Sequence, residues 1–156
     1  MSIAVCVFIT WCTIVALALI PKKLTSLEMV FLFFVCTIFE LSVFNIFNLN
    51  LQWMMVSKNV EKSLADLVMR LICIPVALLM ASNFILYSSK FLKWGLTAAM
   101  VLLGVLMQKT IEWLGILSTP NWNIGYTALL FCSYIVFTGL MTIFITRLKQ
   151  AEGQLA

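Results

Sequence analysis

Histidine is absent from this sequence of 156 residues, and charged residues make up only 10% of it. The chain therefore lacks the commonest general base and the commonest metal ligand, and Ser–His and Cys–His catalysis are excluded. Asp66 is the only aspartate, which excludes catalysis by a pair of aspartates. The glycine-rich phosphate-binding motifs and the G-x-S-x-G hydrolase motif are also missing. We expect a protein that is not an enzyme and binds no cofactor.

Hydrophobic residues, in contrast, make up 63% of the chain. A soluble domain has about 45–50% apolar and about 25% charged residues, so a water-soluble fold of this length has no place for so much apolar surface. The lipid bilayer is the solvent that suits this composition. The net charge of +4 is modest and is typical of lysines in membrane loops. It predicts no nucleic-acid binding.

Apolar runs long enough to cross a bilayer, which takes about 20 residues, recur along the whole chain. The expected spans are residues 3–20, 27–47, 67–87, 95–117 and 124–145. We predict an all-α fold, a single transmembrane domain of five helices. The longest connection carries charged residues at every fourth position, which form one stripe on a helix: Lys58, Lys62, Asp66 and Arg70. This pattern predicts an amphipathic juxtamembrane extension before the third helix, lying at the interface.

The distribution of lysine and arginine predicts the orientation of the spans. With five spans and the N-terminus outside, the inner side carries six basic residues: Lys22, Lys23, Lys90, Lys93, Arg147 and Lys149. The outer side carries three, namely Lys58, Lys62 and Arg70. Because cytoplasmic loops are enriched in basic residues, the sequence favours an N-out, C-in topology.

Three ionisable residues within the spans form a candidate intramembrane polar site: Glu40, Lys109 and Glu112. A charge at this depth costs about 2.5–3.5 kcal/mol on insertion scales. We expect Glu40 to face the protein interior, uncharged, and to form a hydrogen bond with Asn83 or Gln108; pairing with Lys109 would instead keep it ionised. Its role is either structural or that of a proton or cation site.

Two further pairs are predicted from their spacing on a helix. Lys109 and Glu112 are three residues apart and share a helix face. Asp66 and Arg70 are four apart, and we expect an exposed ion pair at the outer interface, worth about 0.3–0.5 kcal/mol. Reversal of both charges in that pair would then be nearly silent.

Close helix packing is predicted at pairs of small residues four apart, such as Gly95 with Ala99 and Ala77 with Ala81. Pro75 predicts a local distortion of the third helix, because proline removes one backbone hydrogen bond. The five cysteines are scattered through apolar runs without a C-x-x-C motif, and we interpret them as small buried apolar residues.

Several short motifs carry a resemblance to a known group of proteins. In chain order they are Ile20-Pro21-Lys22-Lys23, Glu28, Arg70-Leu71-Ile72-Cys73-Ile74-Pro75, Thr110-Ile111-Glu112-Trp113 and Asn121-Trp122-Asn123-Ile124-Gly125-Tyr126-Thr127. With them the chain resembles small multi-pass membrane proteins of endospore-forming, bacillus-like bacteria that have no assigned activity. The resemblance implies a bacterial plasma membrane, or a spore membrane, and no catalytic residue.

Two functions are favoured by these observations, ahead of a third, a lipid-handling protein in which the basic stripe of residues 58–70 holds anionic headgroups. The first is a non-enzymatic integral membrane subunit that acts through helix–helix contacts with itself or with a larger membrane complex. The alternative is a small oligomeric transporter or channel for a proton, cation or small solute, with Glu40 and Glu112 along its path.

Overall fold

The structure, a computed structural model, describes residues 1–87, 90–120 and 122–153. Asn121, which belongs to one of the motifs above, lies outside the described residues. The elements are α1 (Ser2–Leu19), α2 (Ser26–Asn45), η1 (Ile46–Asn50), β1 (Met55–Val56), α3 (Val60–Val68), η2 (Met69–Cys73), α4 (Ile74–Ile85), α5 (Lys90–Trp113), β2 (Leu117–Ser118) and α6 (Ile124–Gly153). Here η1 and η2 are π-helical turns.

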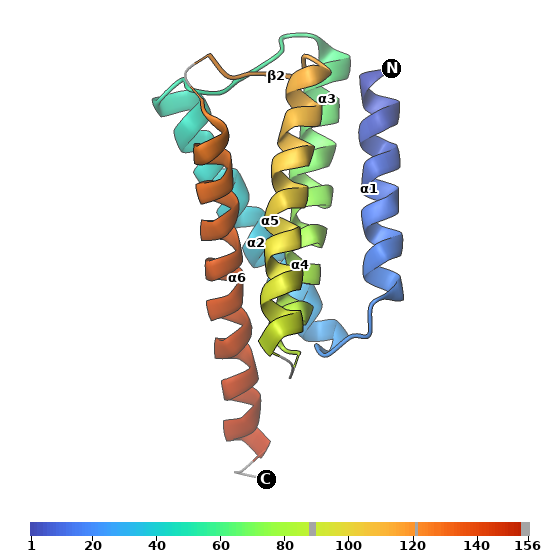
Figure 1. The fold of residues 1–156 in the computed structure, drawn as a ribbon, viewed down its shortest axis with the longest axis vertical. Helices are drawn as coiled ribbons and strands as arrows, with labels where there is room; N and C mark the ends of the chain where they lie inside the picture. Colours follow the sequence, from blue (N-terminus) through green and yellow to red (C-terminus); the bar gives the residue numbers. More distant parts are fainter. Residues whose placement is uncertain (88–89, 121, 154–156) are drawn as a thin grey trace.

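The predicted all-α bundle of five membrane-length helices is confirmed. Within the described residues, the helices long and apolar enough to cross a membrane are Ser2–Leu19, Ser26–Asn50, Val60–Ile85, Lys93–Trp113 and Ile124–Lys149. The third of these is central, since 67% of its most apolar stretch is buried, against 11% for α1. Figure 1 shows α1 and α6 at opposite edges of the bundle.

Local sequence signals set where the first two helices end and begin. Pro21 follows Ile20, the residue that caps the C-terminal end of α1. The proline ring disfavours a helical conformation of the residue before it, and Ile20 is extended, with ψ 135°. Thr25 then caps α2: the Glu28 N–H donates to the Thr25 hydroxyl, and the Thr25 N–H donates to the Glu28 carboxylate at 2.6 Å. This reciprocal capping satisfies two backbone donors that the helix start leaves free.

The predicted extension before the third span is helical, but it is continuous with that span. Asn59 caps α3 by accepting a hydrogen bond from the Glu61 N–H. From there α3, η2 and α4 form one apolar helix over Val60–Ile85. The π-turn η2 ends at Cys73, two residues before Pro75. It is the distortion that this proline predicted, since a wider turn accommodates a residue without a backbone N–H.

A short antiparallel strand pair, which the sequence did not predict, joins two connections at one end of the bundle. Met55 of β1 pairs with Ser118 of β2, and Val56 pairs with Leu117. The pair ties the α2–α3 connection to the α5–α6 connection (Figure 1). We call this the β1–β2 end, and the N-terminus of the chain lies beside it.

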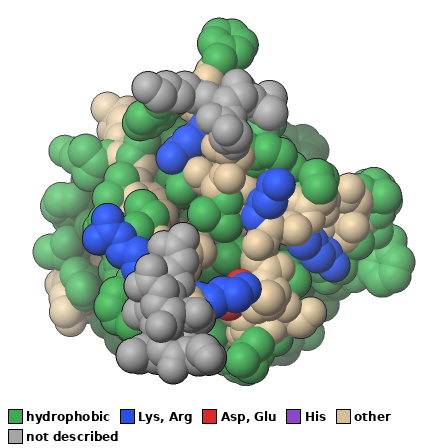
Figure 2. Space-filling view, turned by 90° about the horizontal axis from the view of Figure 1, so that it is seen from below, with side chains coloured by type: hydrophobic (Ala, Val, Ile, Leu, Met, Phe, Trp, Pro, Cys, Tyr) green, Lys and Arg blue, Asp and Glu red, His purple; other side chains and the backbone are tan. Residues whose placement is uncertain are grey.

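The opposite end, which we call the basic end, carries the α1–α2 connection and the last turns of α6 (Figure 1). Its basic residues include Lys22, Lys23, Lys93, Arg147 and Lys149. Figure 2 views the molecule from this side and shows lysine and arginine side chains spread among hydrophobic ones. Lys149 forms an ion pair with Glu28 at 3.5 Å and so links α6 to the start of α2.

Candidate functional site

Three ionisable side chains meet inside the bundle: Glu40 from α2, Asp66 from α3 and Arg70 from η2. The Arg70 Nη1 donates to Glu40 Oε1 at 2.8 Å, and the Arg70 Nε donates to Asp66 Oδ2 at 2.9 Å. Their residues are only 0%, 4% and 7% exposed, respectively. We call this group the acidic triad, because it joins two carboxylates to one guanidinium.

The structure brings Asp66 and Arg70 together as their spacing predicted, but not where it was predicted. Both side chains are buried, so the expectation of an exposed pair at the interface is wrong. The reason is Glu40, which meets Arg70 from a helix thirty residues earlier and draws the guanidinium into the bundle. The Phe44 ring covers the guanidinium, with Arg70 Cζ 3.3 Å from the ring centroid.

Glu40 lies in the interior, as predicted, but its partner is none of the three candidates. Asn83 instead accepts a hydrogen bond from the backbone N–H of Lys23, close to the basic end. Lys109 pairs with Glu112 on its own helix. Because a guanidinium stays protonated in proteins, pairing with Arg70 favours an ionised Glu40. The predicted neutral partner is therefore wrong, whereas the uncharged state of Glu40 stays a prediction.

Each member of the acidic triad keeps one polar atom without a hydrogen-bond partner in the described part of the chain. These atoms are Glu40 Oε2, Asp66 Oδ1 and Arg70 Nη2, and Gln108 Nε2 is a fourth such atom. Glu40 and Gln108 line an internal cavity of about 10 Å³ together with Tyr134. That is about the minimum space for one water molecule. Gln108 therefore belongs to the surroundings of Glu40, although it forms no direct bond with it.

A second, larger space reaches the acidic triad from another side. It is a groove of about 490 Å³ between the α2–η1 helix and the α3–η2 helix. Its polar lining consists of Asn45, Asn48, Ser63, Asp66 and Arg70. We call it the α2–α3 groove. The other lining residues are apolar. The polar side chains provide a place where water can enter the groove, which wholly apolar packing would exclude.

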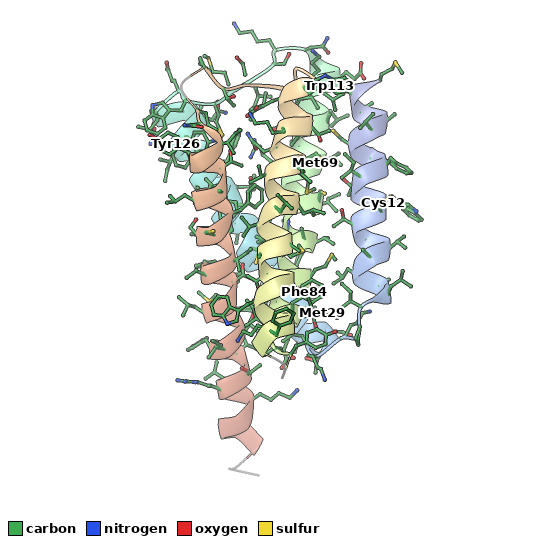
Figure 3. All side chains as sticks on the ribbon, in the orientation of Figure 1. Cys12, Met29, Met69, Phe84, Trp113 and Tyr126 are labelled. Carbon is green, nitrogen blue, oxygen red and sulfur yellow. The ribbon has the colours of Figure 1, made fainter. Side chains whose placement is uncertain are left out.

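The other two predicted intramembrane residues form a separate pair. Lys109 donates to Glu112 over three residues of α5, and Thr119 also donates to Glu112 at 3.1 Å. The Lys109 side chain is 47% exposed, and the pair lies near Trp113, toward the β1–β2 end in Figure 3. The predicted site of Glu40, Lys109 and Glu112 is thus divided, and Arg70 and Asp66 take the place of the latter two beside Glu40.

The electrostatic balance of the acidic triad determines its chemistry. With both carboxylates ionised, two negative charges face one positive charge, so the group carries a net charge of −1. A buried, uncompensated charge is costly in a membrane-spanning bundle. One added proton brings the net charge to zero. Two carboxylates that share one guanidinium are therefore suited to bind and release a single proton.

No protein family model, no curated protein and no solved structure matches the chain. The fold and the buried charges alone define the class, which is that of a multi-pass membrane protein with an ionisable group inside its helix bundle.

Proposed function

We propose that this chain is a small, non-enzymatic proton-exchanging membrane protein, the subunit of a transporter or channel. The observation that carries the proposal is the buried acidic triad, in which two carboxylates share one guanidinium. Ionisable residues inside membrane helices commonly mark proton and ion pathways. The π-turn that holds Arg70 supports the same interpretation, because such turns are frequent at functional sites.

The proposed location is the plasma membrane or spore membrane of a bacterium, with the N-terminus outside and the C-terminus in the cytoplasm. The bacterial origin rests on the family resemblance of the sequence motifs. The orientation rests on the basic residues, which are concentrated at the end of the bundle opposite the N-terminus. The β1–β2 end then faces outward.

Proton flux into liposomes tests the function. The purified protein is reconstituted with a pH-sensitive dye inside the vesicles, and a potassium diffusion potential drives proton entry. We expect flux with the natural protein and none with Glu40→Gln, which removes the surplus acid. Glu112→Gln is the matched control, because Glu112 pairs locally on α5, and it should keep the flux. Absence of flux from well-folded natural protein contradicts the proposal.

A second candidate is a membrane subunit that acts through helix–helix contacts with a second copy or with a larger complex. The position of α1 favours it, because this helix is the least buried and presents Phe8 and Trp11 outward. Cys12 is exposed on the same helix, which forms one edge of the bundle in Figure 3. Oxidation in native membranes should then cross-link Cys12 to a neighbouring chain, whereas Cys12→Ala should not cross-link at that position. A monomer after oxidation contradicts this candidate.

A further inference from the structure

Arg70 and Phe44 separate two spaces that contact different members of the acidic triad. On one side lies the α2–α3 groove, which is lined by Asp66 and Ser63. On the other lies the internal cavity, which is lined by Glu40 and Gln108. Arg70 and Phe44 line both spaces. The two carboxylates therefore differ in access: Asp66 borders the open groove, and Glu40 borders the small cavity.

The groove also has a direction along the bundle. Its lining includes Asn48 of η1 and Val56 of β1, so it extends toward the β1–β2 end. Toward the basic end, the space next to Glu40 is filled by an apolar cluster that includes Cys36, Leu78 and Ala81. A further apolar cluster of Leu24, Leu32 and Leu79 follows. Apolar packing of this kind excludes water, so in the described part of the chain the polar approach to the acidic triad is from the β1–β2 end.

We infer that this conformation loads the acidic triad from the β1–β2 end, with Asp66 as the first proton acceptor and the basic end closed. The inference rests on the proposed function and adds its direction. A hydronium ion in the groove gives one proton to the carboxylate of Asp66, which lines the groove, and becomes water. The triad then changes from a net charge of −1 to zero. Arg70 keeps all of its protons and retains Glu40 as its ionised partner. Release returns the same proton to water.

The lining of the groove favours a proton over a metal cation. The guanidinium of Arg70 borders the groove beside Asp66, and its positive charge repels a metal ion. A metal site also needs several ligands, and no group of three histidine, cysteine, aspartate or glutamate side chains suited to a metal ion occurs within residues 1–87, 90–120 and 122–153. A proton needs only the unpartnered Asp66 oxygen.

Accessibility to a charged reagent tests the direction without any measurement of flux. Ser63→Cys places a thiol in the groove, and Ser82→Cys places one at a fully buried position on α4, toward the basic end. The protein is held in lipid nanodiscs and treated with a cationic methanethiosulfonate, and peptide mass spectrometry locates the label. We expect labelling at 63 and none at 82. Native Cys12 is the control for a lipid-facing thiol and should stay unlabelled.

Infrared spectroscopy then tests the loading of the proton. The natural protein should show a protonated-carboxyl C=O band that shifts rapidly in D₂O, as a water-filled groove requires. Both Asp66→Asn and Glu40→Gln should abolish the band, because each variant leaves a single carboxylate that is paired with the guanidinium of Arg70. An unlabelled cysteine at 63, a labelled one at 82, or a band unchanged by Asp66→Asn overturns the inference. If the labelling and the infrared band are as expected but the natural protein shows no proton flux, the transport function is overturned and the direction of loading stays supported.

A final measurement joins the two proposals. If the natural protein conducts protons, then labelling of Ser63→Cys should reduce its flux at least tenfold, because the added positive charge stands in the groove. Flux that persists after complete labelling contradicts the groove as the route and leaves the proposed function intact. The natural protein treated with the same reagent serves as the control, and no change of its flux is expected, because Cys12 stays unlabelled.

Discussion

Phe44 lies flat against Arg70, with the guanidinium carbon 3.3 Å from the centroid of the aromatic ring. The same guanidinium donates to Glu40 on one side and to Asp66 on the other. Arginine in a membrane helix usually extends its long side chain to reach water. Here the ring covers one face while two carboxylates hold the edges, and these contacts keep the charge inside the bundle.

Phe44→Leu should destabilise the protein by about 2 kcal/mol, because a desolvated cation–π contact is lost. Phe34→Leu is the control, since Phe34 lies on the same helix but is 60% exposed to the outside of the bundle. Thermal unfolding in detergent, followed by intrinsic fluorescence, measures both. Equal unfolding temperatures for the two variants would show that the contact with Arg70 contributes nothing.

Exchange of the charges of Asp66 and Arg70 should be severe, contrary to the expectation from sequence. The double variant Asp66→Arg with Arg70→Asp places a carboxylate opposite Glu40 in the buried position of the guanidinium. Loss of a buried pair costs about 3–5 kcal/mol. The matched control is the exchange of Lys109 and Glu112, a partly exposed pair worth about 0.3–0.5 kcal/mol. The yield of monodisperse protein after gel filtration compares them, and a normal yield from the Asp66–Arg70 exchange would disprove the burial.

Neutralisation of one acid should be tolerated, whereas neutralisation of both should not. Glu40→Gln and Asp66→Asn each leave one carboxylate for Arg70, so the triad becomes electrically neutral. The combined variant leaves a buried guanidinium without a counter-charge, at a cost of about 3–5 kcal/mol. We expect near-normal unfolding temperatures for the single variants and little folded protein for the double one. Additive, small effects would argue against a shared guanidinium.

Gly104 marks a close contact between α5 and α6. A Cβ atom at this position would lie 2.5 Å from the ring of Phe131, so Gly104→Ala forces the ring to move, at about 1–3 kcal/mol. Gly95→Ala is the control, because nothing lies within 4 Å of its Cβ position. Chemical denaturation in detergent should separate the two variants. If both behave alike, the α5–α6 contact is looser than described.

The orientation can be tested with reporters at the two termini. If each of the five membrane-length helices found in the described residues crosses the bilayer, α1 begins and α6 ends on opposite sides of it. A reporter that is active only in the cytoplasm should be active after residue 156 and silent before Met1. The reverse result would place the basic end outside and invert the direction inferred for proton loading.

Hydropathy and spacing predicted those features that depend on neighbours along the chain. The five spans follow from the apolar runs, and the Asp66–Arg70 and Lys109–Glu112 contacts follow from helical spacing. The meeting of Glu40 with Arg70 did not follow, because depths on different helices cannot be aligned from the sequence. The interpretation of residues 58–70 as an interfacial stripe also concealed that Arg70 is buried.

Packing predictions from small residues were only partly useful. Ala77 and Ala81 are buried in α4, whereas Gly95 has no close neighbour and the tight contact occurs at Gly104. Cys12 and Cys132 were expected to be buried and are exposed on the outside of the bundle. In a membrane protein an apolar residue is equally suited to a lipid-facing position, so apolar character alone does not distinguish inside from outside.

The π-turn at Met69–Cys73 holds one residue more than a regular helix needs over the same stretch. Hydrogen bonds in a π-turn join residues five apart instead of four, so loss of Ile72 would leave a regular α-helix that keeps Asp66 and Ile74 close to their present faces. The spacing of Asp66 and Arg70 is unchanged by such a loss. Loss of a residue from α4 has no such reserve and would turn the helix beyond it by about 100°. The third helix should therefore tolerate a shorter chain within this turn better than one after it.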